Sequence, residues 1–351
     1  MTDALIQTFR RQGRACQNLG SPFHAALLAL AADDLEGGWD GAGLFAPWAE
    51  ADAMAMFADA VPLRFLGGLH DMVLEGADAE LAAAYPAPGR AADPARAWAA
   101  ARAAVAARTE RLAAFMAHEP QTNEVRRSVC LIGGFLEVAR ASGLPLQVFE
   151  IGSSAGLNLS FDRYRYDLGG ACVGPADAPV RLDTDWSGPA APVDAPLQVA
   201  ARAACDRRPG DLTDPAQRRR LLAYIWPDQF ERLGRIRAAI DLALELGVKV
   251  DAADAVAWTR ERVAPRAGRA TVLFHSVFWQ YMPAESQAAL AAAIADVGAR
   301  AGAEAPFAWL RMEPAPPSMA AMEVRLTLWP AGEDRVLAEV HPHGAWVKWA
   351  G

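Results

Sequence analysis

The 351-residue chain contains few cysteines and no long uncharged apolar segment. Its four cysteines (Cys16, Cys130, Cys172 and Cys205) are scattered and include no Cys-x-x-Cys pair, so we expect reduced thiols. The most apolar stretch, 95–117, is interrupted by arginines and a glutamate. A membrane-spanning helix needs about 18 uncharged apolar residues. The sequence therefore predicts no membrane span.

Basic residues are also fewer than acidic residues in this chain. The chain has 34 Lys and Arg against 42 Asp and Glu, which gives a net charge of -8. Proteins that bind nucleic acid or anionic membranes normally carry a basic surface, so a small molecule is the expected partner. The first residues lack a basic start, which predicts no signal peptide and a cytoplasmic protein.

The segment 147–160 carries the most informative pattern of the chain. Val148-Phe149 is a short apolar run, which is typical of a buried parallel strand. Glu150 ends this run, glycines and small residues follow from Gly152 to Gly156, and the next residues predict the start of a helix. A strand, a small-residue turn and a helix form the beginning of a mononucleotide-binding crevice.

The spacing of this turn argues against a dinucleotide. The pattern is Glu-x-Gly-x-x-x-Gly, because Ser154 takes the place of the middle glycine of Gly-x-Gly-x-x-Gly. A complete glycine fingerprint that would hold a pyrophosphate is therefore missing. The acidic side chain of Glu150 at the strand end disfavours phosphate and suits a cationic or amine-bearing group.

The order of the predicted elements indicates an α/β fold. Residues 1–142 predict an α-helical N-terminal domain, and strands alternate with helices from 143 to about 301. Such alternation is typical of a doubly wound, mainly parallel sheet with helices on both faces. The chain closes with a predicted antiparallel hairpin, Val324 to His341. We therefore expect a second domain over 143–351, with an insertion around 163–196.

Several blocks of the chain resemble known families. Glu150-Ile151-Gly152-Ser153-Ser154-Ala155-Gly156-Leu157-Asn158, Trp226-Pro227-Asp228-Gln229 and Phe274-His275-Ser276 resemble the signature blocks of a bacterial family of unknown function. The first block also resembles the first motif of class I S-adenosylmethionine-dependent methyltransferases. This resemblance implies a Rossmann-like methyltransferase sheet, S-adenosylmethionine as cofactor, and methyl transfer to a small polar molecule.

The resemblance also implies a set of cofactor-binding residues. Glu150 would lie by the amino-acid end of the cofactor, and the acidic residue that ends the second strand would hold the ribose. Asp206 is the first choice for the ribose, with Asp183 and Asp185 as alternatives; Asp254 would accept the adenine amino group. The full set is Glu150, Gly152, Ser153, Ser154, Gly156, Asn158, Asp206, Asp254 and Ser276.

Residues at the end of the fourth core strand would lie near the transferred methyl group. His275 is the candidate general base, Gln280 and Tyr281 could orient the acceptor, and Trp279 could stack on a flat ligand. The alternative for His275 is a buried histidine bonded to a neighbouring carboxylate. The polar cluster Asn123, Glu124 and Arg127 predicts either one wall of the substrate site or a capped helix start.

Other hypotheses use the same residues differently. The protein could keep the fold without catalysis and bind an adenosyl metabolite or a partner protein. Gly-x-Ser-x-Gly is also present, so Ser154 could be the nucleophile of a serine hydrolase, with His341 or His343 as base and Asp254 or Glu313 as acid. His341-Pro342-His343 lacks a third ligand at a recognisable spacing, so no metal site is predicted.

Overall fold

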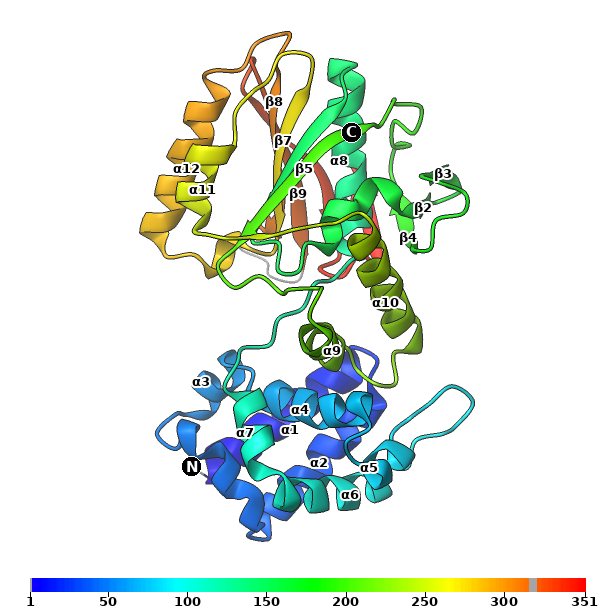
Figure 1. Cartoon of the computed structure of the whole chain (residues 1–351), viewed down its shortest axis with the longest axis vertical. Helices are drawn as coiled ribbons and strands as arrows, with labels where there is room; N and C mark the ends of the chain where they lie inside the picture. Colours follow the sequence, from blue (N-terminus) through cyan, green and yellow to red (C-terminus); the bar gives the residue numbers. More distant parts are fainter. Residues whose placement is uncertain (1, 316–320) are drawn as a thin grey trace. The chain divides into compact units, whose positions relative to one another are not determined.

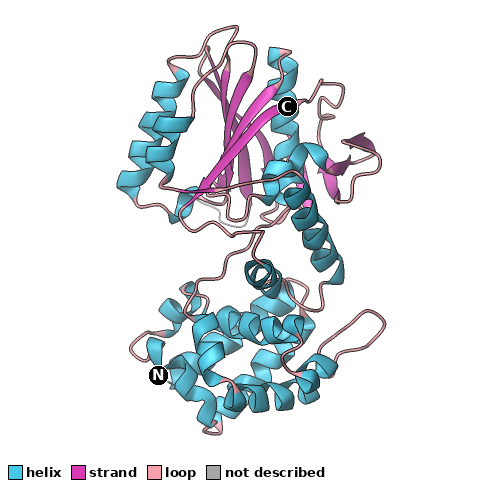
Figure 2. Ribbon diagram, viewed as in Figure 1, coloured by secondary structure: helices cyan, strands magenta, loops and turns pink. Residues whose placement is uncertain are grey.

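The computed structural model describes residues 2–315 and 321–351 (Figures 1 and 2). The chain forms two compact units. One contains the residues up to Thr122 together with Asp214–Arg237, and the other contains Asn123–Thr213 and Ala238–Gly351. We call them the helical unit and the sheet unit.

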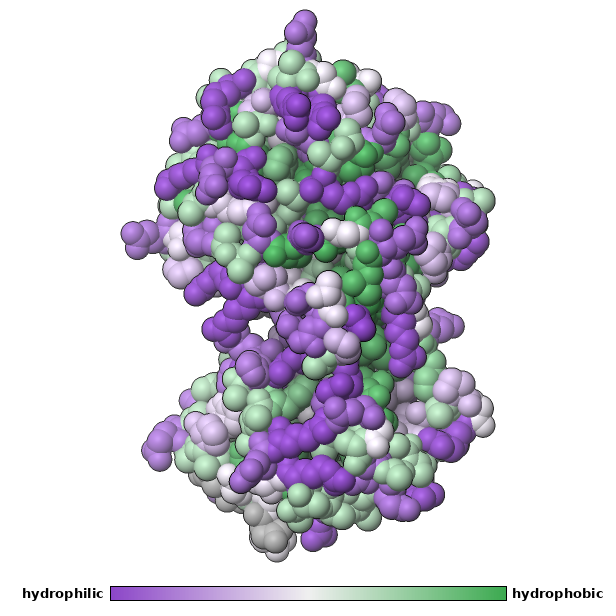
Figure 3. Space-filling model, in the orientation of Figure 1, coloured by the Kyte–Doolittle hydropathy of each residue, from purple (hydrophilic) through white to green (hydrophobic). Residues whose placement is uncertain are grey.

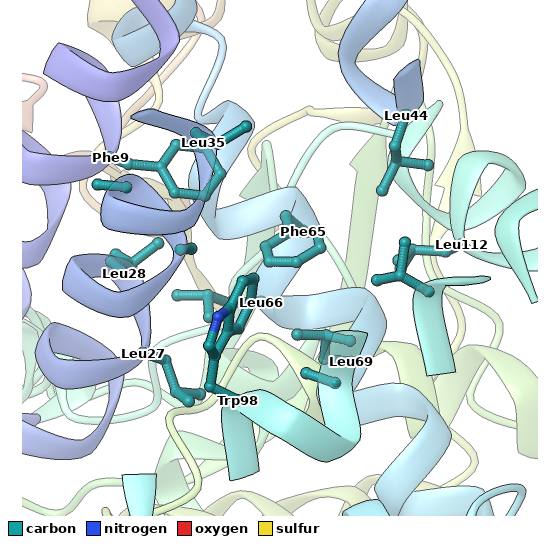
Figure 4. Close-up of a cluster of buried hydrophobic side chains, with 14 of the residues drawn as sticks. Phe9, Leu27, Leu28, Leu35, Leu44, Phe65, Leu66, Leu69, Trp98 and Leu112 are labelled. Carbon is teal, nitrogen blue, oxygen red and sulfur yellow. The ribbon is translucent and has the colours of Figure 1, made fainter. Parts of the chain in front are cut away.

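The helical unit is built from amphipathic helices around one apolar core. Helix starts follow local sequence signals: Ser21, Asp93 and Asp214 cap helices whose first turn holds a proline. Phe9, Leu28, Phe65 and Trp98 are among the core side chains (Figure 4). The elements are α1 (Thr2–Asn18), α2 (Pro22–Glu36), η1 (Asp40–Trp48), α3 (Ala53–Ala58), α4 (Val61–Glu75), α5 (Ala79–Ala84), α6 (Pro94–Ala107), α7 (Thr109–Met116), α9 (Pro215–Ala223) and the first half of α10 (Phe230–Glu245).

Polar contacts hold the second stretch of this unit, Asp214–Arg237, to the helices of the first stretch. Arg219 donates from Nε to Asp71 at 2.8 Å, and the ring of buried His70 lies with Nδ1 3.2 Å from the carbonyl oxygen of Ala223. Ser21 donates to Asp228 at 2.7 Å. The helical unit is therefore assembled from two separate stretches of the chain.

Among the described residues of the sheet unit, eleven strands form one sheet in the order β3-β2-β4-β11-β10-β9-β8-β7-β1-β5-β6. The strands are β1 (Leu146–Ile151), β2 (Arg165–Leu168), β3 (Ala171–Val173), β4 (Arg181–Ser187), β5 (Val199–Asp206), β6 (Asp251–Ala252), β7 (Ala270–Ser276), β8 (Phe307–Pro314), β9 (Met322–Trp329), β10 (Glu333–Val340) and β11 (Trp346–Trp349).

Strand β1 lies inside the parallel part of this sheet. It pairs in parallel with β5 on one side and with β7 on the other. The chain first adds β5 and β6 on one side of β1, then returns to add β7 and β8 on the other side. The expected α/β architecture with a mostly parallel central sheet and a closing β9–β10 hairpin is confirmed.

Helices cover both faces of the central strands (Figures 1 and 2). Helix α8 (Arg127–Ser142) packs closely on one face, because Gly133 and Gly134 leave room for the side chains of Trp349 and Leu310. On the other face, α11 (Ala255–Arg262) and α12 (Ala284–Gly298) bury apolar side chains against Leu273 of β7. The carboxyl ends of the parallel strands lie between the layer formed by α8 and the layer formed by α11 and α12.

The structure differs from the sequence expectations at three places. The expected domain boundary at 142 does not match, because α8 contacts β7, β8 and β9, and Asp214–Arg237 packs with the helices. The insertion around 163–196 forms β2, β3 and β4, which join the main sheet through β11. The expected α-helix after the glycine turn is a short 3-10 helix, η2 (Leu157–Arg163).

Candidate functional site

Four polar side chains stand at the carboxyl ends of neighbouring parallel strands. Glu150 lies in β1, Asp206 ends β5, His275 lies in β7 and Glu313 lies in β8. Because these strands are parallel, their carboxyl ends meet at one edge of the sheet. The strand order reverses between β1 and β7, which is where open α/β sheets form a ligand-binding crevice. We refer to this edge as the switch-point edge.

The turn that follows β1 is held by the end of β5. Ser154 donates its backbone N–H to Asp206 Oδ2 at 2.8 Å and accepts from the Gly210 N–H at 3.3 Å. Ser153 donates its N–H to the carbonyl of Cys205 at 3.2 Å. Ser154 has a φ of 57°, a left-handed conformation that is uncommon for a residue other than glycine. The neighbouring backbone therefore imposes the shape of this turn.

The two glycines of the turn face protein side chains. A β-carbon on Gly152 would lie 2.1 Å from the ring of Phe278, and one on Gly156 would lie 2.8 Å from Val250. Both glycines also have a positive φ, of 65° and 75°. Each glycine therefore lets another part of the protein approach the turn, and the ligand-binding role expected for Gly152 and Gly156 stays a prediction.

Asp206 is the acidic residue of the strand next to β1, as expected. Its Oδ1 accepts from the Arg208 N–H at 2.8 Å, and the side chain is half-buried. A carboxylate oxygen can accept more than one hydrogen bond, so both oxygens keep capacity for further donors. The alternatives Asp183 and Asp185 lie in β4, which pairs with β11 and β2.

Glu150 is buried with an incomplete set of partners. The residue is 3% exposed, and its Oε2 has no hydrogen-bond partner among the described residues. Burial raises the pKa of Glu150 well above its usual value, the nearby Asp206 raises this pKa further, and Arg127 opposes the shift. A buried, unpaired carboxyl group is costly, so a ligand that donates hydrogen bonds or carries positive charge would stabilise it.

His275 is fully buried, and both of its ring nitrogens are engaged. Trp309 donates from Nε1 to His275 Nε2 at 3.1 Å, so the ring carries its proton on Nδ1, which lies 2.7 Å from Glu313 Oε1. Trp279 stacks on the same ring, with centroids 5.8 Å apart. The expected role of His275 as a general base does not fit this geometry. The alternative of a buried histidine bonded to a carboxylate is confirmed.

Glu313 stands at this edge but is not among the cofactor-binding and acceptor-binding residues expected from the sequence. Its Oε1 accepts from His275 and from the Phe278 N–H at 2.9 Å, and its Oε2 has no partner among the described residues. The signal that could have identified Glu313 is its position, since it follows an apolar run as Glu150 does. From the sequence, Glu313 was expected only as a possible acid of a serine hydrolase.

The polar cluster before α8 is divided between structural and site positions. Asn123 accepts from the Leu157 N–H at 2.9 Å, and Ser128 donates to Asn158 at 2.7 Å, so both asparagines fix η2 in place. Arg127, the first residue of α8, lies within electrostatic range of Glu150 and Glu313. Burial lowers the pKa of Arg127, and the charges of Glu124, Tyr281 and Glu313 oppose that shift, while its Nε has no partner within the described chain.

The remaining predicted residues are more peripheral. Asp254 is exposed and caps α11, since its Oδ1 accepts from the Val256 and Ala257 N–H groups at 3.0 and 3.1 Å. Gln280 is exposed, and Tyr281 is 76% exposed. Ser276 is half-buried at the end of β7. The expected adenine contact of Asp254 would have to use its second oxygen.

The serine-hydrolase hypothesis finds no base beside Ser154. Ser154 Oγ makes no hydrogen bond to any described residue, and His275 is already engaged. His341 follows β10, four strands from β1, which corresponds to roughly 19 Å across the sheet. The Nδ1 atom of His341 accepts from the His343 backbone N–H at 3.0 Å.

Three further observations concern metals, membranes and cavities. Within residues 2–315 and 321–351, no group of three or more His, Cys, Asp and Glu side chains could hold a metal ion. None of the helices in the same ranges is long and apolar enough to cross a membrane, and the face drawn in Figure 3 mixes hydrophilic and hydrophobic residues. A cavity of about 270 Å³ lies beside β5 and β6, lined by Arg202, Lys249 and Ala204, the residue that pairs with Glu150 of β1.

Comparison with known proteins identifies the family of the chain. The family described as "Uncharacterized protein conserved in bacteria (DUF2332)" matches residues 6–349, so the chain belongs to it. No curated protein and no solved structure matches the chain.

Proposed function

Starting from a family without an assigned activity, we propose that this protein binds S-adenosylmethionine at the switch-point edge and transfers its methyl group to a small polar molecule. The strand order β6-β5-β1-β7-β8 supports the proposal. It corresponds to the order 3-2-1-4-5 of Rossmann-like sheets, whose ligands bind outside the carboxyl ends of the strands at the reversal.

The observation that carries the proposal is the unpaired Oε2 of Glu150. This oxygen is buried at the switch-point edge, and the nearby carboxylate of Asp206 makes its ionisation more costly. A ligand with an ammonium or sulfonium group would offset this cost, whereas a phosphate would increase it. S-adenosylmethionine carries both cationic groups and no phosphate.

Three residues of the chain would hold the cofactor. Glu150 would accept from its amino group, Asp206 would accept from the ribose hydroxyls, and the unpartnered Ser154 hydroxyl could reach a polar group of the ligand. When bound, S-adenosylmethionine supplies an activated methyl group. The protein then has to hold the acceptor in line and exclude water, tasks that depend on position more than on covalent chemistry.

A non-catalytic protein that binds an adenosyl metabolite is the second candidate. The engagement of both ring nitrogens of His275 favours it, because no free imidazole base stands at the end of β7. The two candidates share the ligand site and differ only in whether a methyl group is transferred.

Calorimetric titration of the full-length protein tests the shared part of the proposal. We expect S-adenosylmethionine and S-adenosylhomocysteine to bind, and NAD and ATP not to bind, because both carry phosphates. Glu150→Gln should weaken binding at least about tenfold, the range expected for a charged hydrogen bond. Glu339→Gln is the matched control, since Glu339 is an exposed partner of Lys348 in β10.

The outcomes separate the candidates. Absence of binding by both adenosyl ligands would contradict the proposal. Binding without transfer of labelled methyl to any small molecule of a bacterial extract would leave the non-catalytic candidate.

A further inference from the structure

We propose that the methyl acceptor is a small amine and that Glu313 binds its nitrogen. This inference rests on the proposed function and adds the chemical class of the acceptor. It also assigns the Trp309–His275 pair a positioning role.

The geometry of Glu313 leaves one oxygen for a ligand. Oε1 accepts both from His275 Nδ1 at 2.7 Å and from the Phe278 N–H at 2.9 Å, while Oε2 has no partner among the described residues. The side chain is 14% exposed, so Oε2 is largely removed from bulk water. An ionised carboxylate only accepts hydrogen bonds, and its missing partner is therefore a donor.

The charges near Oε2 of Glu313 indicate which chemical class of donor would bind there. Glu313 lies within electrostatic range of Arg127, whose Nε has no partner among the described residues. An anionic acceptor would be repelled by the carboxyl group of Glu313, and a neutral alcohol would donate a weaker hydrogen bond to Oε2 than a charged donor does. An ammonium group both donates to Oε2 and offsets the negative charge of Glu313. To react, the nitrogen passes that proton to Oε2, and its lone pair then forms the N–CH3 bond as the S–CH3 bond of S-adenosylmethionine breaks. The products are neutral S-adenosylhomocysteine and a methylated ammonium.

The buried histidine keeps Glu313 in position. The Trp309 N–H occupies His275 Nε2, which leaves the proton on Nδ1 and makes His275 a donor to Glu313. The stacked ring of Trp279 further restricts rotation of the imidazole. One oxygen of Glu313 is thus fixed by two donors, so the other keeps one orientation. His275 is therefore a positioning residue that acts through Glu313.

Product analysis with the wild-type protein tests the acceptor class. The full-length protein is incubated with methyl-labelled S-adenosylmethionine and the small-molecule fraction of a bacterial extract. The labelled product is then separated from the cofactor by chromatography. We expect a product that is cationic at pH 7. A neutral or anionic product, or no product from a protein that binds S-adenosylhomocysteine, would overturn the inference.

Variants test the role of Glu313. Glu313→Gln should lower turnover at least about 100-fold, because an amide no longer offers a charged acceptor, and should change the affinity for S-adenosylhomocysteine less than twofold. Glu339→Gln should change neither quantity. A cationic product formed by Glu313→Gln at the wild-type rate would also overturn the inference.

The positioning role of His275 has its own readouts. In ¹⁵N NMR spectra of the imidazole, the wild-type protein should show a single tautomer with the proton on Nδ1, and Trp309→Phe should mix the tautomers. His275→Gln should raise KM for the amine more than it lowers kcat, with S-adenosylhomocysteine affinity kept. A tautomer with the proton on Nε2, or an unchanged KM, would exclude this role.

The experiments distinguish this inference from the proposed function. If neither adenosyl ligand binds to the wild-type protein, the proposed function fails and the inference fails with it. If S-adenosylhomocysteine binds and the labelled product carries no positive charge, only the inference fails.

Discussion

The ring of Phe278 lies where a β-carbon on Gly152 would stand, with 2.1 Å between that position and the nearest ring carbon. The glycine turn after β1 is therefore closed on this side by the segment that follows β7. The neighbouring Val277 has a φ of 53°, an unfavourable conformation for a β-branched residue. The junction of β1 and β7 is thus tightly packed and conformationally restrained.

Gly152→Ala should destabilise the sheet unit by about 2–5 kcal/mol, because it adds a left-handed alanine and a steric clash. Urea denaturation followed by circular dichroism measures the change. Gly268→Ala is the control, since Gly268 has a φ of 75° and no atom within 4 Å of its β-carbon position; it should cost only about 1–2 kcal/mol.

A second variant separates the two contributions at Gly152. In the Phe278→Ala background, Gly152→Ala should cost about 1–3 kcal/mol less, because the ring is gone and the backbone strain remains. Equal costs in both backgrounds would show that the ring does not restrict this position.

Glu150→Gln should stabilise the sheet unit and weaken ligand binding together. The raised pKa of Glu150 means that the native state holds a proton that the unfolded state releases. The contribution of Glu150 to the free energy of unfolding is fully present below its pKa in the unfolded state, 4.5. This contribution is lost as pH rises through its pKa in the folded state. Denaturation at pH 5 and pH 8 should therefore show a gain for Glu150→Gln that increases with pH. A constant difference would contradict the raised pKa.

The helical unit should lose stability in acid because of His70. Burial lowers the pKa of His70 from 6.5 to about 4, so the unfolded chain binds a proton that the folded unit does not. The stability is fully present above pH 6.5 and is lost as pH falls toward 4, by about 3 kcal/mol. Hydrogen exchange of α4 amides between pH 4 and 7 measures this loss.

A conservative variant provides the control for His70. His70→Asn can keep the hydrogen bond to Ala223 but does not titrate, so it should flatten the pH dependence. If the slope is unchanged, the acid sensitivity arises elsewhere, and buried His24, whose pKa is also lowered by burial, becomes the candidate.

His275→Ala should cost about 2–5 kcal/mol, since it leaves Glu313 and the Trp309 N–H without their buried partner. Trp309→Phe removes one of the two contacts and should cost less. Chemical denaturation of both single variants and of the double variant gives their coupling, which we expect at about 0.5–3 kcal/mol. Strict additivity would mean that the Trp309–His275 hydrogen bond does not contribute.

The presence and parallel pairing of the central strands could be predicted because each strand has a local signature. Apolar runs ending at Glu150, Asp206 and His275 became β1, β5 and β7, and alternation with helices predicted their parallel pairing. The carboxylates at the strand ends could also be identified in the sequence, because each one stands where a predicted strand ends. Asp206 could be chosen because it ends the predicted second core strand, whereas the alternatives Asp183 and Asp185 lie in the inserted segment.

Features that depend on distant partners could not be predicted. Strand β11 has only four residues and gains its place by pairing with β4, about 160 positions earlier in the chain. The engagement of His275 depends on Trp309, and the capping of η2 depends on Asn123. No spacing rule connects such residues, so the hydrogen bonds of His275 to Glu313 and Trp309 could be identified only in the assembled sheet.

The composition of the helical unit from two stretches has a consequence for any attempt to isolate it. A fragment that stops at Thr122 would lack Arg219 and the carbonyl of Ala223, and would leave Asp71 and His70 without these partners. The unit could be transplanted only with residues 214–237 joined to it by a linker. During synthesis, its core is incomplete until these residues leave the ribosome, after β1 and β5 have already been made.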